Sequence, residues 1–202
     1  MTEIDTMVFD LGQVLVRWDP RPALDGLHSA DEIDAFLTGR FFTDNHGLDA
    51  GREFEELERE LLEQAPQDAA IWRTYWDGFA RSLGGPVPGM PELVGELKSA
   101  GLRLLGLTNW SAQTFHHAIP SAPVIGELED ILVSGREGLA KPDPAIFTLL
   151  IERFDLTPST TVFTDDSPAN IAAAEAAGLH AVHFTDAAEL RVHLRALGLR
   201  LA

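Results

Sequence analysis

Short apolar runs that alternate with helical segments constrain the fold of this chain more than any other feature. Runs suited to buried strands occur at residues 6–9, 102–107, 130–133, 161–163 and 181–184. The segments between the later runs show the apolar period of helices. Strands that alternate with helices indicate a parallel sheet that is covered on both faces. The sequence therefore predicts an α/β fold with a Rossmann-like, three-layer core.

Two of the expected helices have recognisable beginnings. Asp143 precedes Pro144, which places a capping side chain before a proline at the first helical position. Ser167 and Pro168 repeat this arrangement before an alanine-rich helix that ends near Gly178. These signals predict helices between the strands of the second half of the chain.

Residues 17–84 follow a different pattern and predict an all-helical insertion. Ser29 and Glu32 have the spacing of a capping box. Two apolar stripes at helical spacing follow, at Phe54, Leu57, Leu61 and Leu62, and at Ile71, Trp72, Tyr75, Trp76 and Phe79. A segment rich in glycine and proline then returns the chain to the strand–helix pattern. We therefore expect an α/β core of residues 1–16 plus 85–202 and a helical-bundle domain of residues 17–84.

The composition excludes several classes of function. The 202 residues are 45% hydrophobic, which is ample for a core, and they carry a formal net charge of −17. Such an acidic surface repels nucleic acid and anionic membranes. The chain has no cysteine, which excludes disulfides, thiolate metal sites and cysteine nucleophiles.

The sequence also carries expectations about compartment and assembly. The N-terminus lacks the basic segment and the long apolar run of a signal peptide. No stretch approaches the roughly 20 apolar residues of a membrane span. We therefore expect a cytoplasmic protein without membrane or nucleic-acid partners. Since the apolar stripes can be buried within one chain or against a second copy, both a monomer and a homodimer are open.

Polar residues suited to phosphoryl transfer are associated with these runs. Asp10 ends the first run, Thr108 follows the second, Lys141 comes after the third, and Asp165 and Asp166 follow the fourth. The carboxyl ends of parallel strands lie at one edge of a sheet, where ligands gather in open α/β folds. We therefore expect these side chains to meet in one site, which favours an enzyme.

Each of these residues has a chemical role and an ordinary alternative. The Asp10 carboxylate can attack phosphorus and form an aspartyl-phosphate, or it is a loop aspartate. The Thr108 hydroxyl can hold phosphate oxygens, with Asn109 helping through its backbone amide and by shaping the loop, or it caps a helix. Lys141 can neutralise charge between nucleophile and phosphate, or it is a solvated lysine. Adjacent Asp165 and Asp166 repel each other, which a hard cation such as Mg²⁺ relieves, or they are a polar turn.

Together, these segments resemble the motifs of the haloacid dehalogenase-like (HAD) superfamily. The resemblance is to its phosphatases that carry a helical cap inserted after the first motif. It is carried, in the family's order, by residues 8–15, 107–110, 141–142 and 163–170 and covers essentially the whole chain. The resemblance implies a core sheet of strand order 5-4-1-2-3 with a helical-bundle cap.

The resemblance also implies roles for the polar residues. Asp10 is the nucleophile, Thr108 binds phosphate and Lys141 neutralises charge. The implied ligands of Mg²⁺ are Asp10, the backbone carbonyl of Gly12 and Asp166. Asp165 is implied either as a further ligand or as a residue that contacts the ligands.

One position departs from the family pattern. The family motif usually has a second aspartate two residues after the nucleophile, which serves as general acid and base, whereas this chain has Gly12. General acid–base help is worth about 10²–10⁴ in rate. Either the leaving group departs unprotonated, or a group of the cap substitutes, or turnover is weak. Within the cap segment 41–47, Asp44 and His46 are candidates for substrate contact and for this substitution.

The leading hypothesis is a Mg²⁺-dependent phosphatase that hydrolyses a small phosphorylated metabolite, such as a sugar phosphate, through Asp10. One alternative is a 2-haloacid dehalogenase that uses the same aspartate on carbon. That chemistry needs no cation, so Asp165 and Asp166 argue against it. Another alternative is a weakly active or non-catalytic phosphate-binding protein, which Gly12 supports.

Overall fold

A five-stranded parallel sheet forms the centre of the computed structural model, which describes residues 3–201. Its strands are β1 (Thr6–Phe9), β4 (Arg103–Thr108), β5 (Asp130–Val133), β6 (Thr161–Asp165) and β7 (His180–His183). They are arranged in the order β5-β4-β1-β6-β7. When these five strands are numbered along the chain, the order read from β7 is 5-4-1-2-3. The predicted fold class is therefore confirmed.

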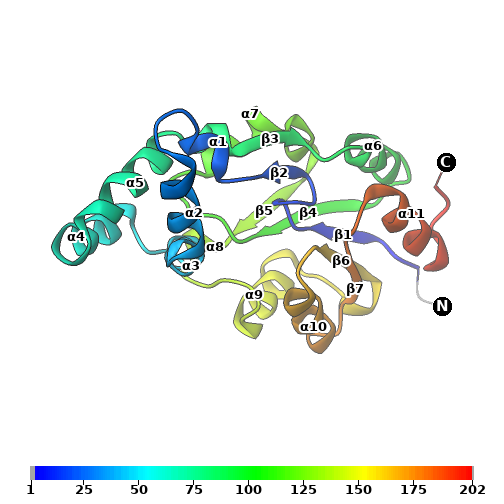
Figure 1. Cartoon of the computed structure of the whole chain (residues 1–202). Helices are drawn as coiled ribbons and strands as arrows, with labels where there is room; N and C mark the ends of the chain where they lie inside the picture. Colours follow the sequence, from blue (N-terminus) through cyan, green and yellow to red (C-terminus); the bar gives the residue numbers. More distant parts are fainter. Residues whose placement is uncertain (1–2, 202) are drawn as a thin grey trace.

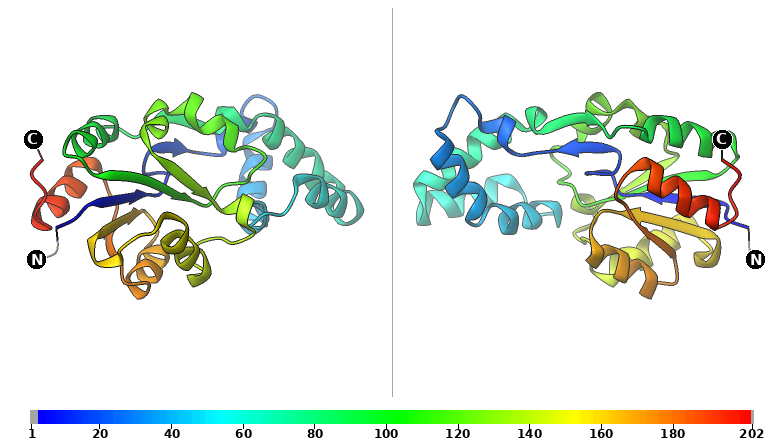
Figure 2. Two further views of the ribbon diagram at one scale, coloured as in Figure 1. Left: turned by 180° about the vertical axis from the view of Figure 1, so that it is seen from behind. Right: turned by 45° about the vertical axis from the view of Figure 1, so that its right-hand side comes forward.

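Helices cover both faces of this sheet (Figure 1, Figure 2). Helices α6 (Met90–Ser99) and α11 (Ala187–Ala196) pack on one face, and α9 (Pro144–Phe154) and α10 (Pro168–Ala176) pack on the other. Along β1, Met7 and Phe9 contact the first layer while Val8 contacts the second, because successive strand side chains point to opposite faces. This arrangement gives the predicted three layers.

The helix beginnings predicted from proline differ in how they are built. Asp143 caps α9, and its side chain accepts a hydrogen bond from the backbone N–H of Ala145 at 2.9 Å. The Ser167 side chain makes no such bond at the start of α10. Its backbone N–H instead donates to the carboxylate of Asp165 at 2.8 Å. The expected serine cap is therefore wrong, since this turn is shaped by Asp165.

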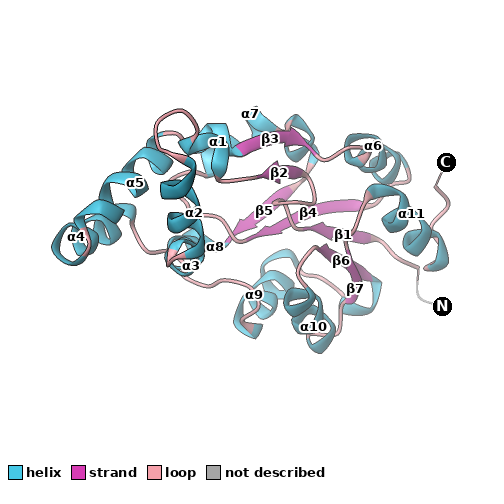
Figure 3. Cartoon of the chain, viewed as in Figure 1, coloured by secondary structure: helices cyan, strands magenta, loops and turns pink. Residues whose placement is uncertain are grey.

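The predicted insertion consists of five helices between β2 (Val16–Trp18) and β3 (Leu83–Pro86) (Figure 3). They are α1 (Arg21–Leu24), α2 (Ala30–Thr38), α3 (Phe41–Asp49), α4 (Phe54–Gln64) and α5 (Pro66–Asp77). Ser29 and Glu32 form the expected capping box at α2. The arrows of β4 and β5 point toward this insertion (Figure 2).

The two crossings between core and insertion are paired. β2 and β3 form a two-stranded antiparallel ribbon, so the glycine- and proline-rich return begins as a strand. The division into residues 1–16 plus 85–202 and 17–84 stays a prediction, and its residues 1, 2 and 202 lie outside the described part.

The short elements are α7 (Ala118–Ser121), α8 (Ser134–Glu137) and 3₁₀ turns at Phe79–Ser82, Phe115–His117, Pro123–Glu127 and Pro158–Thr160. Among the helices described for residues 3–201, none has the length and apolar character needed to cross a membrane.

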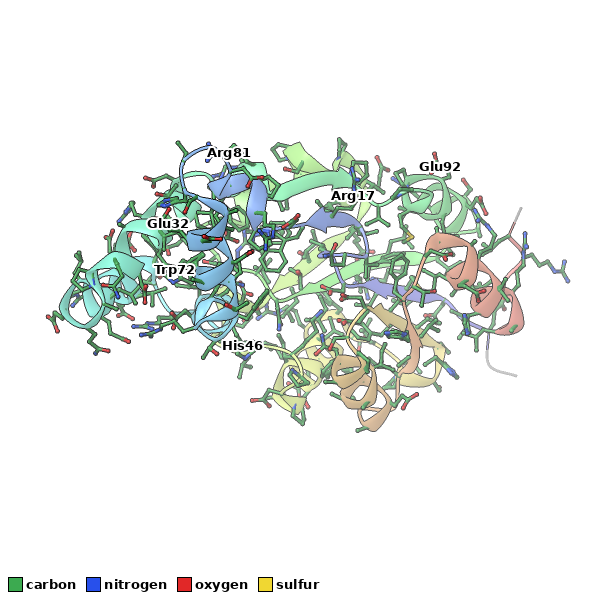
Figure 4. The ribbon with its side chains drawn as sticks, viewed as in Figure 1. Arg17, Glu32, His46, Trp72, Arg81 and Glu92 are labelled. Atoms are coloured by element: carbon green, nitrogen blue, oxygen red, sulfur yellow. The ribbon has the colours of Figure 1, made fainter. Side chains whose placement is uncertain are left out.

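An aromatic cluster holds the insertion together. Phe41 is fully buried, and its ring centroid lies 5.0 Å from those of Phe36, Trp72 and Tyr75. Trp72 lies among the helices of the insertion (Figure 4), as its place in the apolar stripe predicts. Rings at these distances add to the stabilisation that comes from burial.

We predict that Phe41→Ala lowers the free energy of unfolding by about 3–5 kcal/mol, because it leaves a cavity within the aromatic cluster. Phe42→Ala is the matched control, since the neighbouring ring is 57% exposed. Urea denaturation followed by circular dichroism measures both variants. Equal losses for the two would contradict the packing described here.

Candidate active site

The carboxyl edge of the sheet brings the predicted polar residues together. Asp10 follows β1, Thr108 ends β4 and Asp165 ends β6, while Lys141 enters from the loop before α9. The Lys141 Nζ lies 2.9 Å from the carbonyl oxygen of Leu107. The geometry therefore joins the four segments that the sequence singled out.

Lys141 is the centre of this cluster. Its side chain is 1% exposed, and Nζ lies 2.9 Å from Asp10 Oδ1 and 2.6 Å from Asp165 Oδ2. Burial lowers the pKa of Lys141, but the charges of Asp10 and Asp165 outweigh burial and leave the pKa raised. The lysine is therefore a fixed positive charge between two carboxylates.

Hydrogen bonds fix the partners of Lys141 in place. Asn170 Nδ2 donates to both oxygens of Asp165, at 2.9 and 3.1 Å. The Asn109 side chain accepts from the backbone N–H of Lys141 at 2.8 Å and donates to its carbonyl at 2.9 Å. The Asn109 side chain thus holds Lys141, while phosphate contact through the Asn109 backbone amide stays a prediction.

Thr108 carries a buried hydroxyl without a partner. The residue is 1% exposed, and its Oγ1 atom has no hydrogen-bond partner. In the described part of the chain, Trp72 Nε1 is the other buried side-chain atom in this condition. A buried polar atom that lacks a partner costs about 1–3 kcal/mol. A ligand oxygen beside Thr108 would remove this cost.

The nucleophile candidate, Asp10, is itself buried. Its Oδ1 accepts from the backbone N–H of Leu11 at 2.7 Å and faces Lys141. Burial raises the pKa of Asp10 to about 7, although the positive charge of Lys141 lowers it, and the negative charge of Asp165 adds to the rise. The carboxylate lies in an environment where added positive charge favours its ionised form.

Three carboxylates at this edge fit a hard cation. Asp10, Asp165 and Asp166 each offer one carboxylate oxygen, and these three oxygens lie within 4.8 Å of one another. Burial raises the pKa of Asp166, and the neighbouring charge of Asp165 adds to it. Oxygen ligands of this kind suit Mg²⁺. Since both oxygens of Asp165 already accept hydrogen bonds, Asp10 and Asp166 are the better placed ligands. The Gly12 carbonyl stays a predicted third ligand.

A cavity next to these groups lies between the core and the insertion. Its walls are formed by Gly12, Trp18, Asn45, Asp49, Trp76, Phe79, Leu83, Asn109, Trp110, Ser111 and Thr114. The polar part of the wall includes the backbone of Gly12 and the side chains of Asn109 and Asp49. Much of the remaining wall is aromatic. Trp76, a member of the second apolar stripe, thus also forms part of the wall of this cavity.

The structure does not place Asp44 and His46 in the cavity. Asp44 is buried in a forked ion pair with Arg40, with distances of 2.6 and 2.9 Å. His46 is exposed on α3 at the lower edge of the insertion (Figure 4). Residues 41–49 form a helix with one face toward the cavity, and neither residue lies on that face, so their substrate contacts stay a prediction. That face carries Asn45 and Asp49, four residues apart, which sequence reasoning missed.

We predict that Lys141→Met destabilises the protein by about 3–5 kcal/mol, because it leaves two buried carboxylates without their cation. Urea denaturation in EDTA measures this loss without a substitute metal charge. The matched control is Lys98→Met, which removes an exposed pair with Glu127 and costs about 0–1 kcal/mol. A Lys141→Met protein as stable as wild type would contradict this account of the cluster.

Comparisons with known proteins identify the family of this chain. The family model for haloacid dehalogenase-like hydrolases matches residues 4–178. Sesquiterpene phosphatase astK of Aspergillus oryzae is 26% identical over 198 residues, which cover 97% of each chain.

Solved structures show the same fold. A predicted HAD-like family hydrolase from Porphyromonas gingivalis has a TM-score of 0.73 at 25% identity, covering 98% of this chain and 100% of the other. A HAD family enzyme from Bacteroides thetaiotaomicron, solved as a magnesium complex, has a TM-score of 0.72 at 22% identity, covering 96% and 99%. Because the family model spans most of the sequence, the chain belongs to the haloacid dehalogenase-like hydrolases.

Proposed function

We propose that this hydrolase is a Mg²⁺-dependent phosphatase that cleaves a small phosphate monoester through an aspartyl-phosphate on Asp10. The observation that carries the proposal is the contact of Asp10 with a buried lysine at 2.9 Å, beside an unpartnered threonine hydroxyl. A nucleophile, a fixed cation and a free donor are the groups that phosphoryl transfer to a carboxylate requires.

The reaction has two displacements at phosphorus. In the first, a carboxylate oxygen of Asp10 bonds to phosphorus and the bond to the ester oxygen breaks. In the second, water attacks phosphorus, the bond to Asp10 breaks, and phosphate leaves. Lys141 offsets negative charge at the carboxylate, and Thr108 Oγ1 donates to a phosphate oxygen. When bound by Asp10 and Asp166, with the Gly12 carbonyl, Mg²⁺ supplies further positive charge for the approach of the two anions.

The cavity walls bear on the substrate class. Trp18, Trp76, Phe79 and Trp110 offer apolar and aromatic surface next to the polar end at Gly12. Such walls accept the carbon faces of a sugar ring or a compact apolar leaving group. The similarity to a sesquiterpene phosphatase supports testing both kinds of leaving group. The substrate panel should therefore contain sugar phosphates together with prenyl and aryl phosphates.

A 2-haloacid dehalogenase would use the same aspartate on carbon, without a cation. The cluster of Asp10, Asp165 and Asp166 favours the phosphatase, because such a cluster is relieved by metal binding. Release of halide that is unaffected by EDTA would favour the dehalogenase.

We predict that Asp10→Asn removes at least about 10⁴-fold of the phosphatase activity while the fold persists, because the nucleophile is lost. Phosphate release from the substrate panel, with Mg²⁺ and with EDTA, measures this effect. Asp19→Asn is an exposed control that leaves the rate unchanged. Normal Mg²⁺-dependent turnover by Asp10→Asn would reject the assignment.

We predict that Thr108→Val weakens binding of orthophosphate in the presence of Mg²⁺ by about 10–100-fold, because a hydrogen bond to a charged oxygen is lost. Calorimetry measures the Kd. Since the wild-type hydroxyl is buried without a partner, thermal stability without ligand stays the same or rises. Thr148→Val, on the exposed side of α9, is the control. Unchanged phosphate affinity in Thr108→Val would rule out its proposed role.

A further inference from the structure

The proposed reaction, on which this inference rests, needs a group that moves a proton at the leaving oxygen. Gly12 has no side chain to do so, although it lines the cavity. A Cβ placed on Gly12 would meet no heavy atom within 4 Å, so no neighbouring side chain fills this place. A proton donor must therefore come from another wall of the cavity.

Asp49 provides a carboxylate on the opposite wall. It is the last residue of α3, is half-buried, and lines the same cavity as Gly12 and Asn109. The other acid of this helix segment, Asp44, is paired with Arg40, and His46 is exposed. Asp49 is therefore the acidic side chain of the insertion that faces the reacting groups.

Contacts with the core hold this end of α3. The Ser134 hydroxyl donates to the carbonyl of Asp49 and accepts from the backbone N–H of Trp110 at 2.9 Å. Nearby, a Cβ on Gly51 would come within 3.1 Å of Gly138 Cα, so the two backbones are closely packed. These contacts tie the insertion to the loop that follows β4 and to helix α8, which follows β5.

The Asp49 carboxylate is also oriented. Asn45 Nδ2, one helical turn earlier, donates to Asp49 Oδ2 at 2.9 Å. The backbone of Ser111, on the core side, also interacts with this carboxylate and lowers its pKa. One partner comes from the insertion and the other from the core, so the side chain bridges the two parts at the cavity wall.

The electrostatic setting suits proton transfer. Burial raises the pKa of Asp49 to about 7, and the charge of Asp10 adds to this rise, while Ser111 and Lys141 oppose it. The titratable groups that face Asp49 are Asp10, Lys141 and Tyr75. Burial raises the pKa of Tyr75, and the negative charge of Asp49 raises it further. An acid–base group works best when its pKa lies near the working pH.

We propose that Asp49 is the general acid and general base of this site, in the role that Gly12 cannot fill. In the first displacement, protonated Asp49 gives its proton to the ester oxygen as that oxygen separates from phosphorus. In the second, the Asp49 carboxylate takes a proton from the water whose oxygen bonds to phosphorus. The Asp10–phosphorus bond breaks in the same step, so Asp49 is protonated again and Asp10 is free.

The test is Asp49→Asn, which keeps the shape of the side chain but cannot give or take this proton. It is assayed on benzyl phosphate, whose leaving alkoxide needs a proton, and on p-nitrophenyl phosphate, whose leaving group does not. We expect kcat/KM for benzyl phosphate to fall about 10²–10⁴-fold and kcat/KM for p-nitrophenyl phosphate to change only a few-fold. A residue that merely holds the cavity in shape would lower both by the same factor.

The pH dependence gives a second readout. An acid must be protonated to act, so in wild type the ratio of kcat/KM for benzyl phosphate to that for p-nitrophenyl phosphate falls as the pH rises above about 7. In Asp49→Asn this ratio stays constant with pH. Asp44→Asn, on the same helix but in an ion pair, keeps the wild-type ratio and its pH dependence.

A rescue variant completes the test. Because the space beside Gly12 is open, Gly12→Asp introduced into Asp49→Asn is expected to restore turnover of benzyl phosphate. Equal losses on both substrates in Asp49→Asn, or an unchanged pH dependence of the ratio, would overturn the role of Asp49. If Asp10→Asn still abolishes turnover in that case, the phosphatase stands without this inference; if Asp10→Asn remains active, the proposed function itself fails.

Discussion

The buried contact of Lys141 with Asp10 and Asp165 is the interaction on which the rest of the site depends. A buried ammonium group is costly unless its charges and hydrogen bonds are matched. Here two carboxylates and the Leu107 carbonyl supply that match, with Asn109 and Asn170 fixing the geometry. The lysine therefore draws the ends of β1, β4 and β6 and the loop before α9 into one cluster.

The convergence of the polar residues at the strand ends could be predicted from the sequence, because the carboxyl ends of parallel strands meet at one edge of a sheet whatever the details of packing. The residues of the insertion that line the cavity could not be predicted in this way. Residues 41–49 contain adjacent phenylalanines and a glycine, which obscure the helical period, and the direction of each side chain depends on the phase of α3. Asp44 is turned toward Arg40, whereas Asp49 reaches the cavity. The Ser167 side chain does not cap α10, because the Asp165 carboxylate engages the backbone N–H of Ser167 instead.

The site is thus assembled from two parts with different roles. The core supplies Asp10, the buried Lys141 and the acidic cluster, and the insertion supplies much of the aromatic wall and Asp49. Local positive charge matters in a chain with a net charge of −17, because the rest of the surface repels a phosphate ester. In the proposed reaction, Lys141 and a bound cation would offset that repulsion where the ester approaches Asp10.

The central claim is that phosphate passes through a covalent bond to Asp10. The most direct measurement is a rapid quench of the enzyme during turnover, followed by borohydride, which reduces an acyl phosphate to an alcohol, and by mass spectrometry of the peptides. Reduction confined to Asp10, and dependent on substrate and Mg²⁺, is the predicted result. Reduction at another carboxylate, or an enzyme that turns over with Asp10 never modified, would contradict the account.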